Sequence, residues 1–168
     1  MGKLSISRVL RHLWCEDWTL RRAFPQAVLR RIADTIARQE QRHSGELRFA
    51  VEGGLAPWSA LRNPDARLRA VDVFSSLRVW DTAQNNGVLI YVLLAERRVE
   101  IVADRGIHAK VGATAWETIC GEMQRCFSRS AYEEGALIAL EAVSDLLVAH
   151  FPAAGDNPNE LPDEPVVL

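Results

Sequence analysis

Two short polar segments, residues 81–86 and 104–108, hold the side chains most able to do chemistry in this sequence. Four of these side chains carry carboxylate or amide oxygens: Asp81, Asn85, Asn86 and Asp104. Such oxygens are the ligands that hard cations such as Ca²⁺ and Mg²⁺ select in proteins. The pattern therefore indicates a weak divalent-cation site. The alternative is turn chemistry alone, because Asn and Asp also cap turns through their own backbone, and Asn86-Gly87 is a common turn pair.

Arg105 directly follows Asp104 and adds a cation to the second segment. Its guanidinium could pair with a carboxylate or hold a phosphate oxygen. In a metal-dependent phosphatase, the metal polarises the phosphoryl oxygen and activates water, and a fixed positive charge stabilises the developing negative charge. We therefore name Asp104 and Arg105 as candidate catalytic residues. The sequence contains none of the stronger catalytic motifs, such as a GxxxxGK or GxGxxG loop, GxSxG or HExxH.

A β-hairpin is expected to bring the two polar segments together. Residues 88–94, VLIYVLL, are apolar on both sides of the pleat, which favours a central strand covered by helices on both faces. After a tight connection at 95–97, residues 98–104 alternate apolar and polar side chains as a second strand. In an antiparallel pair, the start of one strand lies beside the end of its partner. Segment 81–86 should therefore lie beside segment 104–108.

Helical periodicity surrounds this hairpin. Apolar residues recur at helical spacing in four long stretches: 25–43, 64–77, 114–127 and 130–151. The second stretch is expected to turn four side chains toward the core: Leu68, Val71, Phe74 and Leu77. Thr114 with Glu117, and Ser130 with Glu133, are spaced as capping boxes that would open the last two helices.

One further strand is predicted directly after the first helix. Its apolar residues Leu47, Phe49 and Val51 alternate with the charged residues Glu46, Arg48 and Glu52. Strict alternation of this kind indicates a strand with one more polar face. The residues thus predict a single α/β domain with at least three strands and with helices on both faces of the sheet.

The two ends of the chain are expected to lie outside this domain, which we place at residues 25–151. Residues 1–24 are predicted as a basic N-terminal helical segment, and residues 152–168 as a disordered acidic tail that contains prolines. In the first segment, Val9, Leu13 and Trp14 share a helical face and are the candidate contacts for a protein partner.

Composition excludes several classes of protein. The chain has 168 residues, of which 48% are hydrophobic and 25% charged, as expected for one ordinary globular domain. Aromatic residues are not interleaved with the basic ones, which argues against nucleic acid as a partner. The sequence has neither an export signal nor a run of about 20 apolar residues. We therefore expect a cytoplasmic protein without a transmembrane segment.

The sequence resembles the TPM domain family over residues 26–150. The most specific match is NNGVLIYVLLAERRVEIVADRGI at 85–107, and LRRIADTIARQEQRHSGELRFAVE at 29–52 and RLRAVDVFSSLRVW at 67–80 also match. WETICGEMQRCF and YEEGALIALEAVSDLL follow in the order and spacing of the family. The resemblance implies a three-layer α/β/α sandwich around a small mixed sheet.

The resemblance also implies a shallow acidic groove at the strand-end loops that binds divalent cations, with weak phosphatase activity in some members. Asn85-Asn86-Gly87 stands in the Asp-Asn-Gly or Asn-Asn-Gly turn of the family, and Asp104-Arg105-Gly106 stands in its Gly-x-Gly turn. Many relatives carry Asp just before the first turn, where this chain has Gln84 and Asn85. Because hard cations select charged oxygens, binding of Ca²⁺ or Mg²⁺ is expected to be weak here.

Two functions follow, and the residues alone do not decide between them. The first is a TPM-like domain whose groove weakly binds a divalent cation or a phosphate-bearing ligand and hydrolyses phosphate esters. The second is a non-enzymatic interaction module that assists the maintenance or assembly of membrane proteins. In that case the partner, itself associated with a membrane, would contact the basic N-terminal segment.

Overall fold

A mixed sheet of four strands, in the order β3-β2-β1-β4, forms the middle layer of the computed structural model, which describes residues 17–55, 65–155 and 157–168. The strands are β1 (Leu47–Glu52), β2 (Val88–Leu93), β3 (Arg98–Ala103) and β4 (Val166–Val167). β1 pairs in parallel with both β2 and β4, whereas β2 and β3 are antiparallel. The expected hairpin and the expected mixed sheet are thus confirmed.

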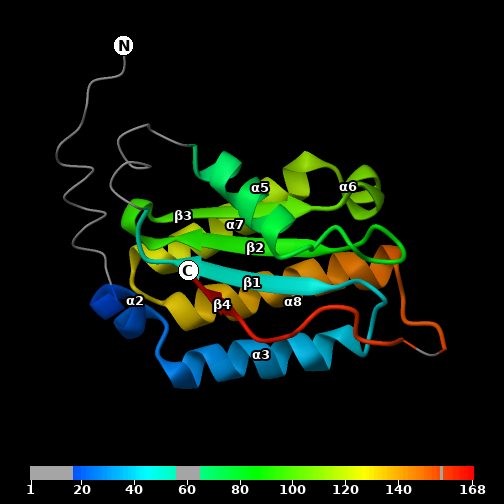
Figure 1. Cartoon of the computed structure of the whole chain (residues 1–168), viewed down its shortest axis with the longest axis horizontal. Helices are drawn as coiled ribbons and strands as arrows, with labels where there is room; N and C mark the ends of the chain where they lie inside the picture. Colours follow the sequence, from blue (N-terminus) through cyan, green and yellow to red (C-terminus); the bar gives the residue numbers. More distant parts are fainter. Residues whose placement is uncertain (1–16, 56–64, 156) are drawn as a thin grey trace, which may run out of the picture.

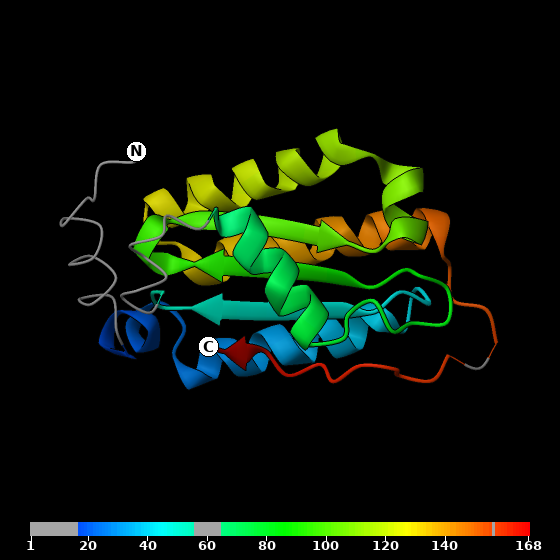
Figure 2. The ribbon, with the colours of Figure 1, turned by 45° about the horizontal axis from the view of Figure 1, so that its top comes forward.

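Helices cover both faces of the sheet, as Figure 2 shows. They are α2 (Asp17–Ala23), α3 (Gln26–Glu40), α5 (Ala66–Ser76), α6 (Arg105–Val111), α7 (Ala113–Ser128) and α8 (Tyr132–His150). A short 3₁₀ helix, Leu94–Glu96, joins β2 to β3. The helices α3, α7 and α8 pack on one face, and α5 packs on the other. This arrangement is the three-layer α/β/α sandwich that the resemblance implied.

The central strand β2 explains why the two layers of helices hold together. All six of its side chains are buried. Val88, Ile90 and Val92 belong to the core beneath α3, α7 and α8, while Leu89 and Tyr91 belong to the core beneath α5. A strand that is covered on both faces needs apolar side chains at every position, which is why its sequence shows no alternation.

Helix α5 packs on the sheet with only part of the expected stripe of apolar residues. Leu68 and Val71 are 63% and 40% exposed, whereas Ala66, Ala70 and Val73 are buried. Phe74 is buried and Leu77 packs against the same core, so the expectation is confirmed for these two residues and wrong for Leu68 and Val71. Asp65 caps this helix by accepting a hydrogen bond from Arg67 N.

The last two long helices also begin differently from the expectation. Helix α7 starts at Ala113, after Gly112 with a φ of +80°, and α8 starts at Tyr132. Neither start has a side-chain cap, so the capping boxes at Thr114 and Ser130 are wrong. The left-handed backbone of Gly112 breaks the chain between α6 and α7 without help from a capping side chain.

The expectation of a disordered tail at 152–168 is wrong for the described residues 152–155 and 157–168. β4 lies in this tail and adds to the free edge of β1, with Ala50 opposite Val166. Asn157 Nδ2 donates to the carbonyls of Glu40 and His43 at 3.0 Å each. The acidic, proline-containing composition predicted disorder because such a segment cannot form a core of its own. The tail is ordered because it docks on an existing sheet edge. No helix among the described residues is long and apolar enough to cross a membrane.

Candidate functional site

The two polar loops meet at one end of the sheet, as the hairpin predicts. Asp104 N donates to Gly87 O at 2.9 Å, and Ile107 N donates to Asn85 O at 3.2 Å. A Cβ atom at Gly106 would lie only 2.5 Å from Asn85 O. The approach of the loops therefore depends on a residue without a side chain at position 106.

Asn86 lies fully buried where the first loop enters β2. Its backbone N donates to Thr82 Oγ1 at 3.1 Å, and its Nδ2 donates to the carbonyl of Ser44 at 2.9 Å. Its side-chain oxygen, Oδ1, is buried and has no hydrogen-bond donor among the described residues. Most buried polar atoms in proteins are hydrogen-bonded, so an orphaned oxygen requires an explanation.

Asp104 presents a second buried oxygen of the same kind. The residue is 6% exposed and caps α6, with Oδ1 accepting from Arg105 N at 2.6 Å. Its other oxygen, Oδ2, is buried and receives no hydrogen bond within the described part of the chain. The two touching loops thus each contribute an oxygen that could satisfy a cation, one neutral and one from a carboxylate.

The remaining predicted site residues are exposed. Asn85 adopts a left-handed backbone with a φ of +53° and packs against Gly106 through its carbonyl, while its side chain faces solvent. Arg105 is exposed at the start of α6. Asp81 is also exposed, and its backbone N donates to Arg78 O in the turn that begins the loop. The structure therefore brings Asn85, Asn86, Asp104 and Arg105 together, whereas Asp81 lies in the opening turn.

Cation binding by this arrangement would rely mostly on neutral oxygens. In the described ranges, no group of three or more His, Cys, Asp or Glu side chains could hold a metal ion. Asp104 provides the only buried carboxylate among the candidate ligands described here. The donor set therefore fits a weak oxygen site for a hard cation rather than a tight one.

Residues that sequence reasoning missed hold the first loop from the other side. The carboxylate of Glu160 accepts from Ala83 N at 3.0 Å, and Ser44 Oγ donates to Gln84 Oε1 at 3.3 Å. A groove of about 430 Å³ lies beside the loop, and its lining includes Ser44, Ala83, Gln84, Asn157, Pro158 and Glu160. Glu160 gave no signal because it lies in the tail that was expected to be disordered.

A group of buried charged residues lies next to this groove, around the start of β1. Burial raises the pKa of Glu40 to about 9, and the nearby carboxylates of Glu46 and Asp163 contribute to this shift. Burial also raises the pKa of Glu46 and lowers that of Arg48. His43 is fully buried with Nδ1 at 3.0 Å from Gly45 O, and burial lowers its pKa to about 4. At neutral pH, His43 is therefore neutral and Glu40 is protonated.

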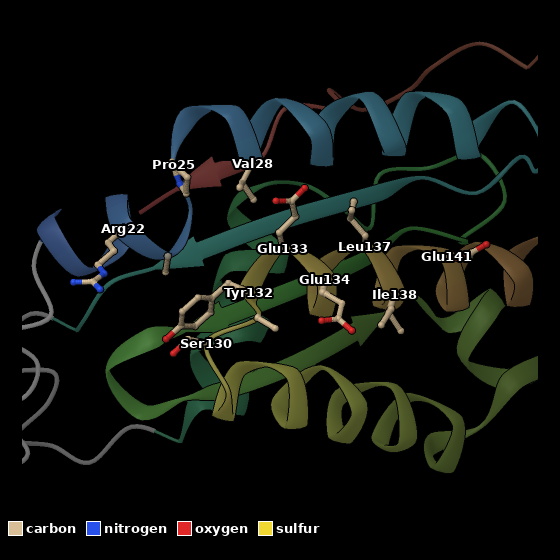
Figure 3. A pocket seen from close by; sticks show the side chains of 12 residues that line it. Arg22, Pro25, Val28, Ser130, Tyr132, Glu133, Glu134, Leu137, Ile138 and Glu141 are labelled. Carbon is tan, nitrogen blue, oxygen red and sulfur yellow. The ribbon is translucent and has the colours of Figure 1, made fainter.

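A larger cavity of about 670 Å³ lies between the start of α3 and the first half of α8 (Figure 3). Val28, Leu137 and Ile138 give it an apolar lining, and Glu133, Glu134 and Glu141 lie around it. None of the loop residues lines this cavity. The predicted partner contacts Val9, Leu13 and Trp14 lie outside the described residues.

Comparison with known proteins supports the family and the fold. A family model described as TPM domain matches residues 20–146. The NMR structure of the BA42 protein from the psychrophilic bacterium Bizionia argentinensis is 30% identical, with a TM-score of 0.74, covering 84% of this chain and 92% of that one. The N-terminal domain of a P. gingivalis protein, 16% identical with a TM-score of 0.60, shares the fold over 77% of this chain and 82% of its own. No curated protein matches the chain.

Proposed function

This chain belongs to the TPM domain family, and we propose that its loops 81–86 and 104–106 form a weak divalent-cation site. The observation that supports the proposal is the pair of buried oxygens, Asn86 Oδ1 and Asp104 Oδ2, which lack hydrogen-bond donors within the described residues. An unsatisfied buried oxygen costs about 1–3 kcal/mol. A cation at the meeting of the loops would remove that cost for both side chains.

The donor chemistry favours Ca²⁺ over Mg²⁺. Ca²⁺ accepts a flexible set of carboxylate, amide and carbonyl oxygens, whereas Mg²⁺ requires near-ideal octahedral geometry and keeps several waters. Asn86 and Asp104 would hold the ion from the buried side, and Asn85 would add an amide oxygen from the exposed side. With a single buried carboxylate, we expect a dissociation constant on the order of 10⁻³ M, as in the weaker extracellular Ca²⁺ modules.

Hydrolysis of phosphate esters is the activity that this site would support. A bound cation polarises a phosphoryl oxygen and lowers the pKa of a bound water. Arg105 is exposed beside the site and makes no side-chain ion pair within the described residues, so its guanidinium is available to a phosphate oxygen. Asp104 is fixed by its bond to Arg105 N, which would keep its free oxygen aimed at the ion.

A matched pair of variants tests the cation site. Asp104→Asn keeps the shape and the helix cap but removes the carboxylate charge. Asp65→Asn makes the same change at the equivalent cap of α5, where Asp65 Oδ1 accepts from Arg67 N. In a Ca²⁺ titration followed by NMR, wild type and Asp65→Asn should show saturating amide shifts at Asn85, Asn86 and Arg105, and Asp104→Asn should not. Equal shifts in both variants would refute the site.

The same proteins test the activity. Wild type should hydrolyse p-nitrophenyl phosphate in a Ca²⁺- or Mg²⁺-dependent manner, and both Asp104→Asn and Arg105→Gln should lose this activity. If wild type binds Ca²⁺ but shows no turnover above a heat-inactivated control, the protein is a cation-binding domain without phosphatase activity.

A docking role is the second candidate, and the cavity in Figure 3 supports it. Its apolar lining and surrounding acids would suit a protein segment that carries apolar and basic side chains. Trp18, 70% exposed, lies against Arg22 of the cavity lining. If this surface binds membrane-associated partners, Ile138→Asp should abolish the complex with an identified partner while Asp104→Asn leaves it intact.

A further inference from the structure

The last residues of the chain, 157–168, run back along the sheet from the loop end to β1 (Figures 1 and 2). We call these residues the strap. Its first contact is Asn157, whose Nδ2 binds the carbonyls of Glu40 and His43 at the end of α3. Its last contact is Leu168, whose backbone N donates to Val51 O at 3.0 Å. The strap therefore spans the length of β1.

The middle of the strap is held by one buried carboxylate. Glu46, 2% exposed, accepts from Glu160 N at 3.2 Å and from Leu161 N at 3.0 Å. Leu161 packs against the core beneath α5. Hydrogen bonds from two adjacent backbone N–H groups to a carboxylate are charge-assisted and are stronger than neutral ones. Glu46 is thus the main polar anchor of the strap.

A buried cation attracts the acidic part of the strap. Arg48 is 6% exposed, and its Nε and Nη1 have no hydrogen-bond acceptor among the described residues. Asp163 and Glu164 of the strap supply negative charge near this guanidinium, as does Glu46 beneath the strap. Leaving a buried guanidinium without counter-charge is costly, so Arg48 favours the docked strap.

Glu160 connects the strap to the candidate site. Its backbone N binds Glu46, while its carboxylate accepts from Ala83 N in loop 81–86. The same loop carries Asn85 and Asn86. Docking of the strap therefore fixes the loop backbone at Ala83. Displacement of the strap would release the loop.

Regular β pairing holds only a small part of the strap. Only Val166 and Val167 pair with β1, and Pro158, Pro162 and Pro165 have no backbone N–H to donate. Val167 and Leu168 remain 49% and 44% exposed. Segments with little buried apolar area and few hydrogen bonds open locally at a small fraction of the global unfolding free energy.

From these contacts we infer that the strap opens and closes as one unit while the sandwich stays folded, and that the closed strap holds loop 81–86 in its ligand-binding conformation. The second part rests on the proposed cation site. Opening would free the edge of β1 and the amide of Ala83 at the same time. The strap thus regulates the affinity of a site that lies more than fifty residues away in the sequence.

Hydrogen exchange at three amides tests whether the strap is a unit. Ala83, Leu161 and Leu168 each donate to a different anchor, namely Glu160, Glu46 and Val51. Glu46→Gln removes the charge of the middle anchor, and Leu161→Ala shortens the apolar anchor on the strap itself. In each variant all three amides should exchange at least about tenfold faster. Losing a charge-assisted hydrogen bond or buried apolar carbons shifts the equilibrium between the docked and the open strap by about this factor. The amide of Ile90 in β2 should keep its rate.

Glu141→Gln is the matched control, since Glu141 is exposed on α8 and has no ion pair or hydrogen bond among the described side chains. It should leave all three rates unchanged. If Glu46→Gln speeds exchange at Leu161 alone while Ala83 and Leu168 keep their wild-type rates, the strap is not a unit. If Glu46→Gln fails to fold, Leu161→Ala gives the same decision without altering the sheet.

A Ca²⁺ titration of the same variants separates the two claims. In a variant whose exchange rates show the strap to be mostly open, the Ca²⁺ affinity at Asn86 should fall by the same factor as the fraction of molecules with a closed strap. If the strap is mostly open in that variant but the affinity stays the same, regulation by the strap is refuted. If wild type shows no Ca²⁺-dependent shift, the proposed function fails, and the exchange rates alone decide whether the strap is a unit.

Discussion

Replacing Glu40 by Gln should stabilise the protein at neutral pH. Glu40 lies in the last turn of α3, is 8% exposed, and accepts a hydrogen bond from Leu47 N at 2.8 Å. Burial raises its pKa from 4.5 to about 9. Above pH 4.5 the unfolded chain loses this proton and the folded chain keeps it, so the free energy of unfolding falls as pH rises toward 9.

The size of the effect follows from the pKa shift. Each pH unit between 4.5 and 9 removes about 1.4 kcal/mol of stability, which amounts to about 3 kcal/mol at pH 7. Gln has no proton to take up, and its Oε1 can still accept from Leu47 N. Its Nε2 can also donate to Asp163, which shares a hydrogen bond with Glu40 in the wild type. Glu40→Gln should therefore gain about 3 kcal/mol at pH 7 and almost nothing at pH 4.5.

Urea denaturation at pH 4.5, 6, 7 and 8 measures this difference. His43 has its pKa lowered to about 4, so its contribution is present above pH 6.5 and is lost as pH falls toward 4. That loss is common to both proteins and cancels in the comparison. A stability difference that stays constant across these pH values, or a variant less stable than wild type at pH 8, would refute the buried, protonated Glu40.

Three other substitutions test packing in the fold. Gly106→Ala should lower the free energy of unfolding by about 1–3 kcal/mol in urea denaturation, because its Cβ would lie 2.5 Å from Asn85 O. Gly121→Ala is the control, because a Cβ there meets nothing within 4 Å, and it should stabilise α7 by about 0.5–1 kcal/mol. Equal effects of the two variants would contradict the close approach of Gly106 to Asn85. Arg69→Met should cost about 2–3 kcal/mol in the same assay, since it leaves the buried carboxylate of Glu52 without its bidentate partner. A neutral result would show that the hydrogen bond from Tyr91 Oη at 2.5 Å satisfies Glu52 alone.

The hairpin and the meeting of the two loops could be predicted from the sequence because they are local. An apolar run and an alternating run joined by a short connection fix the register of β2 and β3, and the register places Gly87 beside Asp104. The side-chain orientations could not be predicted. Whether Asn86 points its oxygen inward depends on Ser44, which is distant in sequence and binds its Nδ2.

The contacts of the strap could not be predicted from the local sequence, for a different reason. β4 is a two-residue strand that pairs with β1 across more than a hundred residues of chain, and two valines are too short a run to predict a strand. Periodicity reports burial against a neighbouring layer, and Val167 is half-exposed even when docked. Only a partner surface elsewhere in the chain orders such a segment.

The sequence does indicate that partner surface, as the polar face of β1. It does not indicate that another part of the chain covers this face. Alternation of Glu46, Arg48 and Glu52 with apolar residues predicted a face toward water, yet all three side chains are buried. Glu52 is satisfied by Arg69 and Tyr91, whereas Glu46 and Arg48 have their counterparts in the strap. Charged side chains that are nearly fully buried are rare unless they are paired. The polar face of β1 is therefore half of an interface whose other half is the end of the same chain.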